Sequence, residues 1–215
     1  MIRGVLFDLD GTLADTERLQ WQAYRTVLLD HGVDVGIEEY RVRWIAVDGG
    51  PEYACHTYGL PFTPLELRAR KTEVYRTLIR RGVEPMPGAR ESLERLGPTH
   101  RLAVATNTVR DEVAVILGHL GMASLLHATI AREDYDRPKP APDAYLAAAA
   151  ALGLAPSECV VVEDTQRGLA SGLAARMAVV AVPSDLTRDN DFTGAAAVVS
   201  SLDELTPALL ARIGV

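Results

Sequence analysis

Residues 5–15, which read VLFDLDGTLAD, constrain the fold and chemistry of this chain more than any other segment. The apolar run at 5–7 is typical of a buried strand, and the carboxylates of Asp8 and Asp10 follow it directly. Carboxylates at the end of a buried strand are unfavourable unless a cation or a proton offsets their charge. Gly11 allows a tight turn at this point. The segment therefore suits phosphoryl transfer, with one carboxylate as nucleophile, the other as proton shuttle and a hard divalent cation between them.

Two other interpretations of this segment are possible. An Asp-x-Asp-Gly sequence also begins calcium-binding EF-hand loops, which need an oxygen ligand at position five, Gly at position six and Glu at position twelve. Thr12, Leu13 and Leu19 hold those positions here, so the calcium loop is excluded. A solvated turn after a strand stays open on the dipeptide pattern alone.

Composition restricts the class of partner. The 215 residues include 22 Lys and Arg against 29 Asp and Glu, and the resulting net charge of −7 disfavours a nucleic-acid partner. The alanine-rich run at 144–155 is too short to span a bilayer and predicts a buried helix, so no membrane partner is expected. Cys55 and Cys159 are expected to be free thiols, and the chain begins with a strand rather than a signal sequence. These features favour a cytoplasmic protein.

Apolar strand-like runs alternate with helical patterns through the second half of the chain, which indicates βαβ units. The predicted fold class is therefore α/β, with a Rossmann-like parallel sheet in the core. The expected strands after the first are 101–106, 127–130, 159–164, 177–182 and 195–199. The expected helices are 88–96, 110–120, 142–152, 166–175 and 202–213.

Residues 16–83 interrupt this alternation and contain no convincing buried strand. We interpret them as an inserted all-helical cap domain, with 1–15 and 84–215 forming the α/β catalytic core and 85–88 as the second hinge. Apolar residues at helical spacing predict the inward faces of two cap helices. The first stripe is Leu19, Ala23, Tyr24, Val27 and Leu28, and the last is Leu65, Ala69, Tyr75, Leu78 and Ile79.

Two further strands also change from apolar to polar at their carboxyl ends, where ligands bind in open parallel sheets. They end in Thr106 with Asn107, and in Glu163 with Asp164; a separate loop, RPKPAPD, places Lys139 between two prolines. Each piece alone has a simpler explanation, such as a turn, a solvated lysine or a helix N-cap. Together they supply the groups that an aspartyl-phosphate mechanism requires.

The four segments DLDGTLAD, Thr106-Asn107, RPKP and VVEDT resemble the sequence motifs of the haloacid dehalogenase superfamily, in its phosphatase and phosphomutase branch. The resemblance spans the chain, and it implies that Asp8 is the nucleophile and Asp10 the general acid and base. It implies that Mg²⁺ is the cofactor. The implied metal site comprises the Asp8 carboxylate, the Asp10 backbone carbonyl and Asp164, with Glu163 nearby or bound through water. The implied phosphate-binding groups are Thr106, the Asn107 backbone amide and Lys139.

Three positions outside these roles carry expectations of their own. Asp15 matches the last Asp of the first motif, and we expect it to cap the first cap helix. Gly168 is expected to permit close packing in the helix after the fourth motif. Arg176 stands where the family often has Gly, which we interpret as a local packing change.

The sequence says less about the substrate. Lys71 matches a cap lysine that contacts substrate in several sugar-phosphate members, although it could belong to a solvated basic face. Arg18 and Trp21 share a stripe on the first cap helix, and Trp21 either packs in the cap or lines the cleft. The segment at 46–54 lacks the Arg of the β-phosphoglucomutase cap loop and is closer to sugar-bisphosphate phosphatases.

The resulting prediction is a Mg²⁺-dependent phosphatase that hydrolyses small phosphate esters, with sugar phosphates favoured, through an aspartyl-phosphate intermediate. A phosphomutase of the β-phosphoglucomutase type is the alternative, and a non-catalytic binding module is disfavoured because no motif residue is missing. The expected partner is a small phosphorylated metabolite, and the expected assembly is a monomer or a weak dimer.

Overall fold

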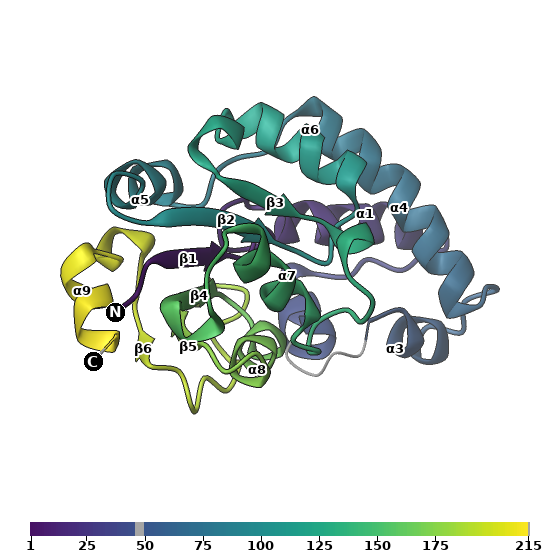
Figure 1. Cartoon of the computed structure of the whole chain (residues 1–215). Coiled ribbons are helices and arrows are strands. Elements are labelled where there is room, and N and C mark those ends of the chain that lie inside the picture. The colour runs from purple at the N-terminus through teal and green to yellow at the C-terminus, as the bar shows by residue number, and fades with distance from the viewer. Residues whose placement is uncertain (46–49, 215) are drawn as a thin grey trace.

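The computed structural model describes residues 1–45 and 50–214, and its centre is a six-stranded parallel sheet (Figure 1). The strand order β3-β2-β1-β4-β5-β6 reverses direction at β1, as in doubly wound nucleotide-binding folds. The predicted α/β class with a Rossmann-like core and a helical insert is confirmed. The strands are β1 (Gly4–Phe7), β2 (Arg101–Ala105), β3 (Ala128–Ile130), β4 (Cys159–Glu163), β5 (Ala178–Ala181) and β6 (Ala197–Val198).

Helices cover both faces of the sheet, so its central strands are apolar on both sides. Successive residues of β1 alternate between the two faces: Val5 and Phe7 join one apolar cluster and Leu6 joins the other. Helices α5, α6 and α9 contribute to the first cluster, and α7 and α8 to the second. These helices are α5 (Ala89–Leu96), α6 (Arg110–Leu120), α7 (Asp143–Ala151), α8 (Gln166–Ala174) and α9 (Pro207–Ile213).

The prediction of a single helix over 202–213 is wrong, because the chain forms a short 3₁₀ turn there and then α9. The 3₁₀ turn η5 spans Leu202–Glu204. The Thr206 hydroxyl then accepts from the Leu209 amide at 3.2 Å and begins the new helix. Pro207 disfavours a helical conformation at Thr206, so one continuous helix cannot form there. The other 3₁₀ turns are η2 (Ala123–Leu125), η3 (Arg132–Asp134) and η4 (Pro156–Glu158).

The insert between β1 and α5 contains only helices in its described part, and we refer to residues 16–83 as the cap. Its long helices α1 and α4 pack against each other, and the stripe predicted on α1 is confirmed, with Leu19 partly buried and the others buried. The stripe predicted for the start of α4 is wrong, because Leu65 is 77% exposed and Ala69 is also exposed. The elements are α1 (Glu17–Leu29), α2 (Ile37–Tyr40), the π-helix η1 (Arg41–Ile45), α3 (Gly50–Thr57) and α4 (Pro64–Arg81).

The inward face of α4 instead follows Leu67, Tyr75 and Ile79, which are buried and separated by multiples of four residues. Leu67 sets this phase because it packs into the aromatic cluster of the cap. Residue 71 lies on the same line, so Lys71 is directed to the inside of the cap rather than to a solvated face.

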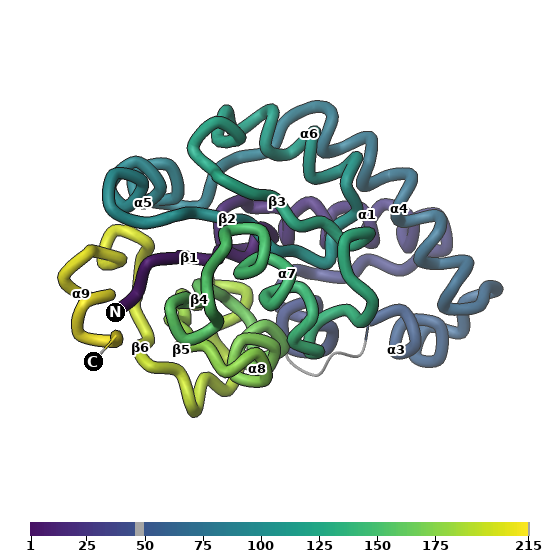
Figure 2. Tube along the Cα trace, viewed as in Figure 1, coloured from purple at the N-terminus to yellow at the C-terminus, as the bar shows by residue number. Residues whose placement is uncertain are grey.

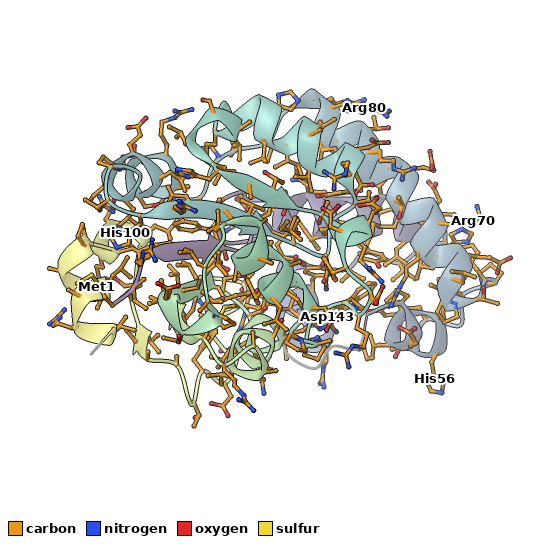
Figure 3. The ribbon with its side chains drawn as sticks, in the orientation of Figure 1. Met1, His56, Arg70, Arg80, His100 and Asp143 are labelled. Atoms are coloured by element: carbon orange, nitrogen blue, oxygen red, sulfur yellow. The ribbon has the colours of Figure 1, made fainter. Side chains whose placement is uncertain are left out.

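The cap lies at one end of the molecule and the chain termini lie at the other (Figure 2). Figure 3 shows the same polarity in single residues, with His56 and Arg70 at the cap end and Met1 and His100 at the opposite end. The two connections between cap and core run side by side, because Ala14 on the first pairs with Pro85 on the second. No helix over 1–45 and 50–214 has the length and apolar character to cross a bilayer. Of the cap segment at 46–54, residues 46–49 lie outside the described residues, and 50–54 belong to α3.

Candidate active site

The polar strand ends meet because β1, β2 and β4 are neighbours at the centre of the sheet. Phe7, the last residue of β1, is in register with Val104 on one side and Val162 on the other. The residues that follow therefore leave the sheet at the same edge, the one next to the reversal in strand order. In Figure 3, Asp143 marks where α7 begins near the centre of the molecule, after the loop that carries Lys139.

Lys139 is the centre of a buried polar network and is only 5% exposed. Its ammonium donates to Asp8 Oδ1 at 2.5 Å, to Glu163 Oε1 at 2.8 Å and to the Tyr145 hydroxyl at 2.8 Å. Burial disfavours this charge, but the Asp8 and Glu163 carboxylates outweigh it and raise the pKa of Lys139. The structure thus brings the predicted nucleophile, the predicted phosphate-binding lysine and one predicted metal-site residue into direct contact.

Asp8, Glu163 and Asp164 form a buried acidic cluster, with one oxygen from each within 4.8 Å of the others. Burial raises the pKa of Asp8 to about 8, with Glu163 and Asp10 adding to the effect and Lys139 opposing it. Burial, followed by the charges of Glu163 and Asp8, also raises the pKa of Asp164 well above its usual range. The one ammonium does not balance these carboxylates, and oxygen ligands at this spacing fit a hard divalent cation such as Mg²⁺.

Two glycines keep this cluster compact. A Cβ atom at Gly11, whose φ is +79°, would overlap the Asp164 carboxylate, and one at Gly168 would overlap the Glu163 carboxylate. The close packing expected at Gly168 is therefore confirmed, and its partner is a site residue.

Asp10 is held by three hydroxyl groups. Thr16 donates to Oδ1 at 2.7 Å, while Thr106 and Thr108 donate to Oδ2 at 2.8 and 2.7 Å. Thr106 was expected to hold a phosphoryl oxygen, but here its hydroxyl orients Asp10, the predicted general acid and base. The arrangement fixes Asp10 beside Asp8 in a defined position.

The Asn107 side chain joins two loops of the site. Its Oδ1 accepts from the Tyr135 hydroxyl at 2.7 Å and from the backbone amide of Lys139 at 3.0 Å. Tyr135 also donates to the Thr106 carbonyl at 2.8 Å. The loop after β2 is thus tied to the loop that carries Lys139.

A cavity of about 790 Å³ lies beside this centre, between cap and core. Lys71 lines it, donates to Gln20 Oε1, and lies over the rings of Tyr24 and Tyr75 at 5.0 and 5.2 Å from their centroids. Burial lowers the pKa of Lys71, and the carboxylates of Glu17, Glu112 and Asp10 oppose that shift. Lys71 thus faces the cavity between cap and core.

The other two cap candidates lie outside the lining of this cavity. Arg18 pairs with Asp15 at 3.2 Å and with Asp185 at 2.5 Å, and lines a separate cavity of about 310 Å³ near the hinge. Trp21 packs in the cap and donates from Nε1 to the Val35 carbonyl at 2.9 Å.

Two of the additional expectations need correction. The N-cap residue of α1 is Thr16, one position later than expected, but the Asp15 carboxylate still accepts from the Arg18 backbone amide in the first turn and also pairs with its guanidinium. Arg176 has a φ of 59°, in the left-handed region, so the departure from Gly at this position is a matter of backbone conformation rather than packing.

Comparison with known proteins identifies the family. A model of the haloacid dehalogenase-like hydrolases matches residues 5–182. The chain belongs to this hydrolase family. It is 34% identical over 206 residues to protein CbbY of Rhodobacter capsulatus, covering 90% of this chain and 91% of that protein. It is 32% identical to fructose-1-phosphate phosphatase YqaB of Escherichia coli, covering 83% of this chain and 95% of that protein.

A solved structure supports the same assignment. CbbY from Rhodobacter sphaeroides in complex with phosphate superimposes with a TM-score of 0.80 at 30% identity, covering 98% of this chain and all of that one. This member of the haloacid dehalogenase-like hydrolases is accordingly an enzyme, and its relatives include named phosphatases.

Sequence reasoning missed the side chains that orient this hydrolase site: Thr16, Thr108, Tyr135 and Tyr145. Tyr145 had a usable signal, because it is the only polar side chain in the apolar run at 144–152 and its helix faces the sheet. Thr16 and Thr108 lie within two residues of predicted site residues, but hydroxyls at such positions commonly serve turns and caps.

Proposed function

We propose that this protein is a Mg²⁺-dependent phosphatase that hydrolyses small phosphate esters, with sugar phosphates as the substrate class, through an aspartyl-phosphate intermediate. The observation that carries the proposal is the buried contact of Asp8 with Lys139 within the cluster that includes Asp164. Positioning and charge stabilisation account for most of the rate in phosphoryl transfer, and this cluster provides both.

In the proposed first step an Asp8 oxygen attacks phosphorus and displaces the alcohol, which takes a proton from Asp10. In the second step Asp10 removes a proton from water, whose oxygen attacks the same phosphorus and restores the Asp8 carboxylate. The three hydroxyls on Asp10 support this double role, because they hold its carboxylate in a defined position.

Lys139, Thr106 and the Asn107 backbone amide are proposed to hold the phosphoryl oxygens. The three N–H donors of Lys139 and the Thr106 hydroxyl already have protein acceptors, so a bound phosphoryl group would replace some of these bonds. The exchange keeps the Lys139 charge within a buried site, where its attraction for an anion is strong.

Asp8, Asp164 and the Asp10 backbone carbonyl are proposed to hold Mg²⁺, with Glu163 as a nearby residue. The bound cation would supply positive charge that offsets the buried carboxylates and the charge developing on the phosphoryl group. The raised pKa values of Asp8 and Asp164 support this requirement.

Sugar phosphates are proposed because the relative YqaB is named a fructose-1-phosphate phosphatase and because the cavity between cap and core suits a ligand of that size. The cap at 16–83 is proposed to select the substrate through Lys71. A cytoplasmic monomer or weak dimer remains part of the proposal, and both cysteines are free thiols.

The proposal is tested with Asp8→Asn and p-nitrophenyl phosphate in Mg²⁺. Wild-type enzyme should release phosphate, and the variant should be folded by circular dichroism yet inactive; turnover by the variant would refute the assigned nucleophile. Incubation with β-glucose 1-phosphate and a bisphosphate primer separates the mutase alternative, which would yield glucose 6-phosphate without free phosphate.

A further inference from the structure

We infer that Trp44 and Asn190 are specificity-determining residues that hydrogen-bond hydroxyl oxygens of the substrate's leaving group, one from each side of the cap–core cavity. The inference rests on the proposed phosphatase function and assigns its selectivity to two side chains outside the sequence motifs. Both residues line the cavity of about 790 Å³, and both have a buried N–H donor without a partner among the described residues.

Trp44 is the donor on the cap side. It belongs to the π-helix η1, is 4% exposed, and packs with ring-centroid distances of 4.7 Å to Tyr24 and 5.5 Å to Tyr40. A buried indole N–H usually finds an acceptor, because leaving it unpaired forfeits its hydration. Tyr40 has its own partner, Glu17, at 2.6 Å, whereas the Trp44 indole N–H has none among the described residues, so an incoming oxygen would satisfy it.

Asn190 is the donor on the core side, in the segment after β5. Its Oδ1 accepts from the backbone amide of Gln166 at 2.8 Å, which fixes the orientation of the side-chain amide. The Nδ2 group is buried and has no acceptor in the described part of the chain. An amide held by its oxygen in this way presents only its donor side to a ligand.

The two donors define the chemistry of the group that they bind. Neutral N–H donors match the neutral oxygens of hydroxyl or carbonyl groups, whereas an anionic group would be served better by the cation of Lys71, which lines the same cavity. Tyr24 and Trp44 also give the cavity wall an aromatic part, which suits the apolar side of a sugar or polyol. Since one donor is on the cap and the other on the core, a polyhydroxylated leaving group would be held from both sides, and a small aromatic ester would not.

The experiment compares kcat/KM for a polyol ester with kcat/KM for p-nitrophenyl phosphate, whose leaving group has no hydroxyl. The best of fructose 1-phosphate, glucose 6-phosphate and sorbitol 6-phosphate serves as the polyol probe. Trp44→Phe and Asn190→Asp should each lower the ratio of the two values about 3- to 10-fold, the range for one lost neutral hydrogen bond. Asn190→Asp keeps the oxygen that accepts from the Gln166 amide, so the local backbone contact survives.

Trp21→Phe is the matched control, because the Trp21 donor is paired with the Val35 carbonyl and lies outside the cavity lining. It should leave the ratio within about twofold. Equal losses on both substrates in the Trp44 and Asn190 variants would assign them to the fold and overturn the inference. So would a wild-type enzyme that turns over p-nitrophenyl phosphate but prefers none of the three polyol esters. A wild-type enzyme inactive on every ester would instead overturn the proposed function, and the inference with it.

Discussion

Replacing Gly168 by Ala tests how tightly the helix after β4 is packed on the buried ion pair. A methyl group at this position would lie 1.8 Å from Cδ and Oε1 of Glu163 and 2.1 Å from Oε2. Side-chain atoms do not tolerate such separations, so either α8 or the Glu163 carboxylate must move. Movement of Glu163 would disturb its hydrogen bonds with Lys139 and Tyr145.

The size of the effect follows from opposing contributions. Ala stabilises a helix interior by roughly 0.5–1 kcal/mol relative to Gly. Against this, forced overpacking costs roughly 1–3 kcal/mol, and loss of one partner of a buried ion pair costs about 3–5 kcal/mol. With partial relaxation, we expect Gly168→Ala to lower the free energy of unfolding by about 2–4 kcal/mol. At roughly 2–4 °C per kcal/mol for a chain of this length, Tm should fall by about 4–16 °C.

Gly118→Ala is the matched control, since Gly118 also lies in a helix and a Cβ there would meet no atom within 4 Å. Thermal unfolding followed by circular dichroism should show a small gain for Gly118→Ala and a large loss for Gly168→Ala. Phosphate release should fall in the Gly168 variant alone. A Gly168 variant as stable and active as the Gly118 variant would refute the packing argument.

Three further predictions follow from single features. In EDTA, Tm should fall as pH rises from about 5 to 8, because Asp8 in the folded protein, with its pKa raised to about 8, keeps a proton that the unfolded chain has released. Mg²⁺ should make Tm less dependent on pH. An equally steep pH dependence of Tm in Asp8→Asn would contradict this assignment. Tyr145→Phe should cost about 2 kcal/mol in urea unfolding, because the hydroxyl bonds both Lys139 and Glu163; an unchanged midpoint would contradict this. Arg176→Gly should raise stability by roughly 0.5–1 kcal/mol in the same assay, because φ is 59° there, and a loss would show that the Arg side chain outweighs the backbone strain.

The sequence pattern predicts an element correctly where all of its apolar residues face the same kind of surroundings. The strands at 101–105 and 159–163 are buried on both faces, so their continuous apolar runs identified them directly. The prediction of which side of α4 faces inward is wrong at the start of the helix, because the apolar residues there do not all face inward. Leu65 is exposed and Leu67 is buried. Periodicity within one helix cannot reveal which neighbour sets its phase, and here that neighbour is the aromatic cluster of the cap.

The site was predictable to the extent that its residues lie in order at the ends of neighbouring strands. Asp8, Lys139 and Asp164 were predicted because each lies in a short motif that can be recognised in the sequence. The Asn107 side chain, by contrast, hydrogen-bonds to groups about 30 positions away in the sequence. These bonds depend on the conformations of two loops rather than on a local sequence pattern. Side chains that only orient other side chains are harder to identify from the sequence, because a hydroxyl group can donate or accept hydrogen bonds in many kinds of site.

The hydrogen bonds of Glu163 show how the acidic residues divide their roles. Its Oε1 accepts from Lys139 and Tyr145, while its Oε2 accepts from the Asp164 amide and from both the amide and the hydroxyl of Thr165. A carboxylate has about four acceptor sites, so these donors occupy all of those that Glu163 offers. Glu163 therefore neutralises and aims Lys139, and its negative charge helps to raise the pKa of both Asp8 and Asp164. Because Glu163 shares the Lys139 ammonium with Asp8, one positive charge faces three buried carboxylates, and a cation beside Asp8 and Asp164 would offset the remaining negative charge.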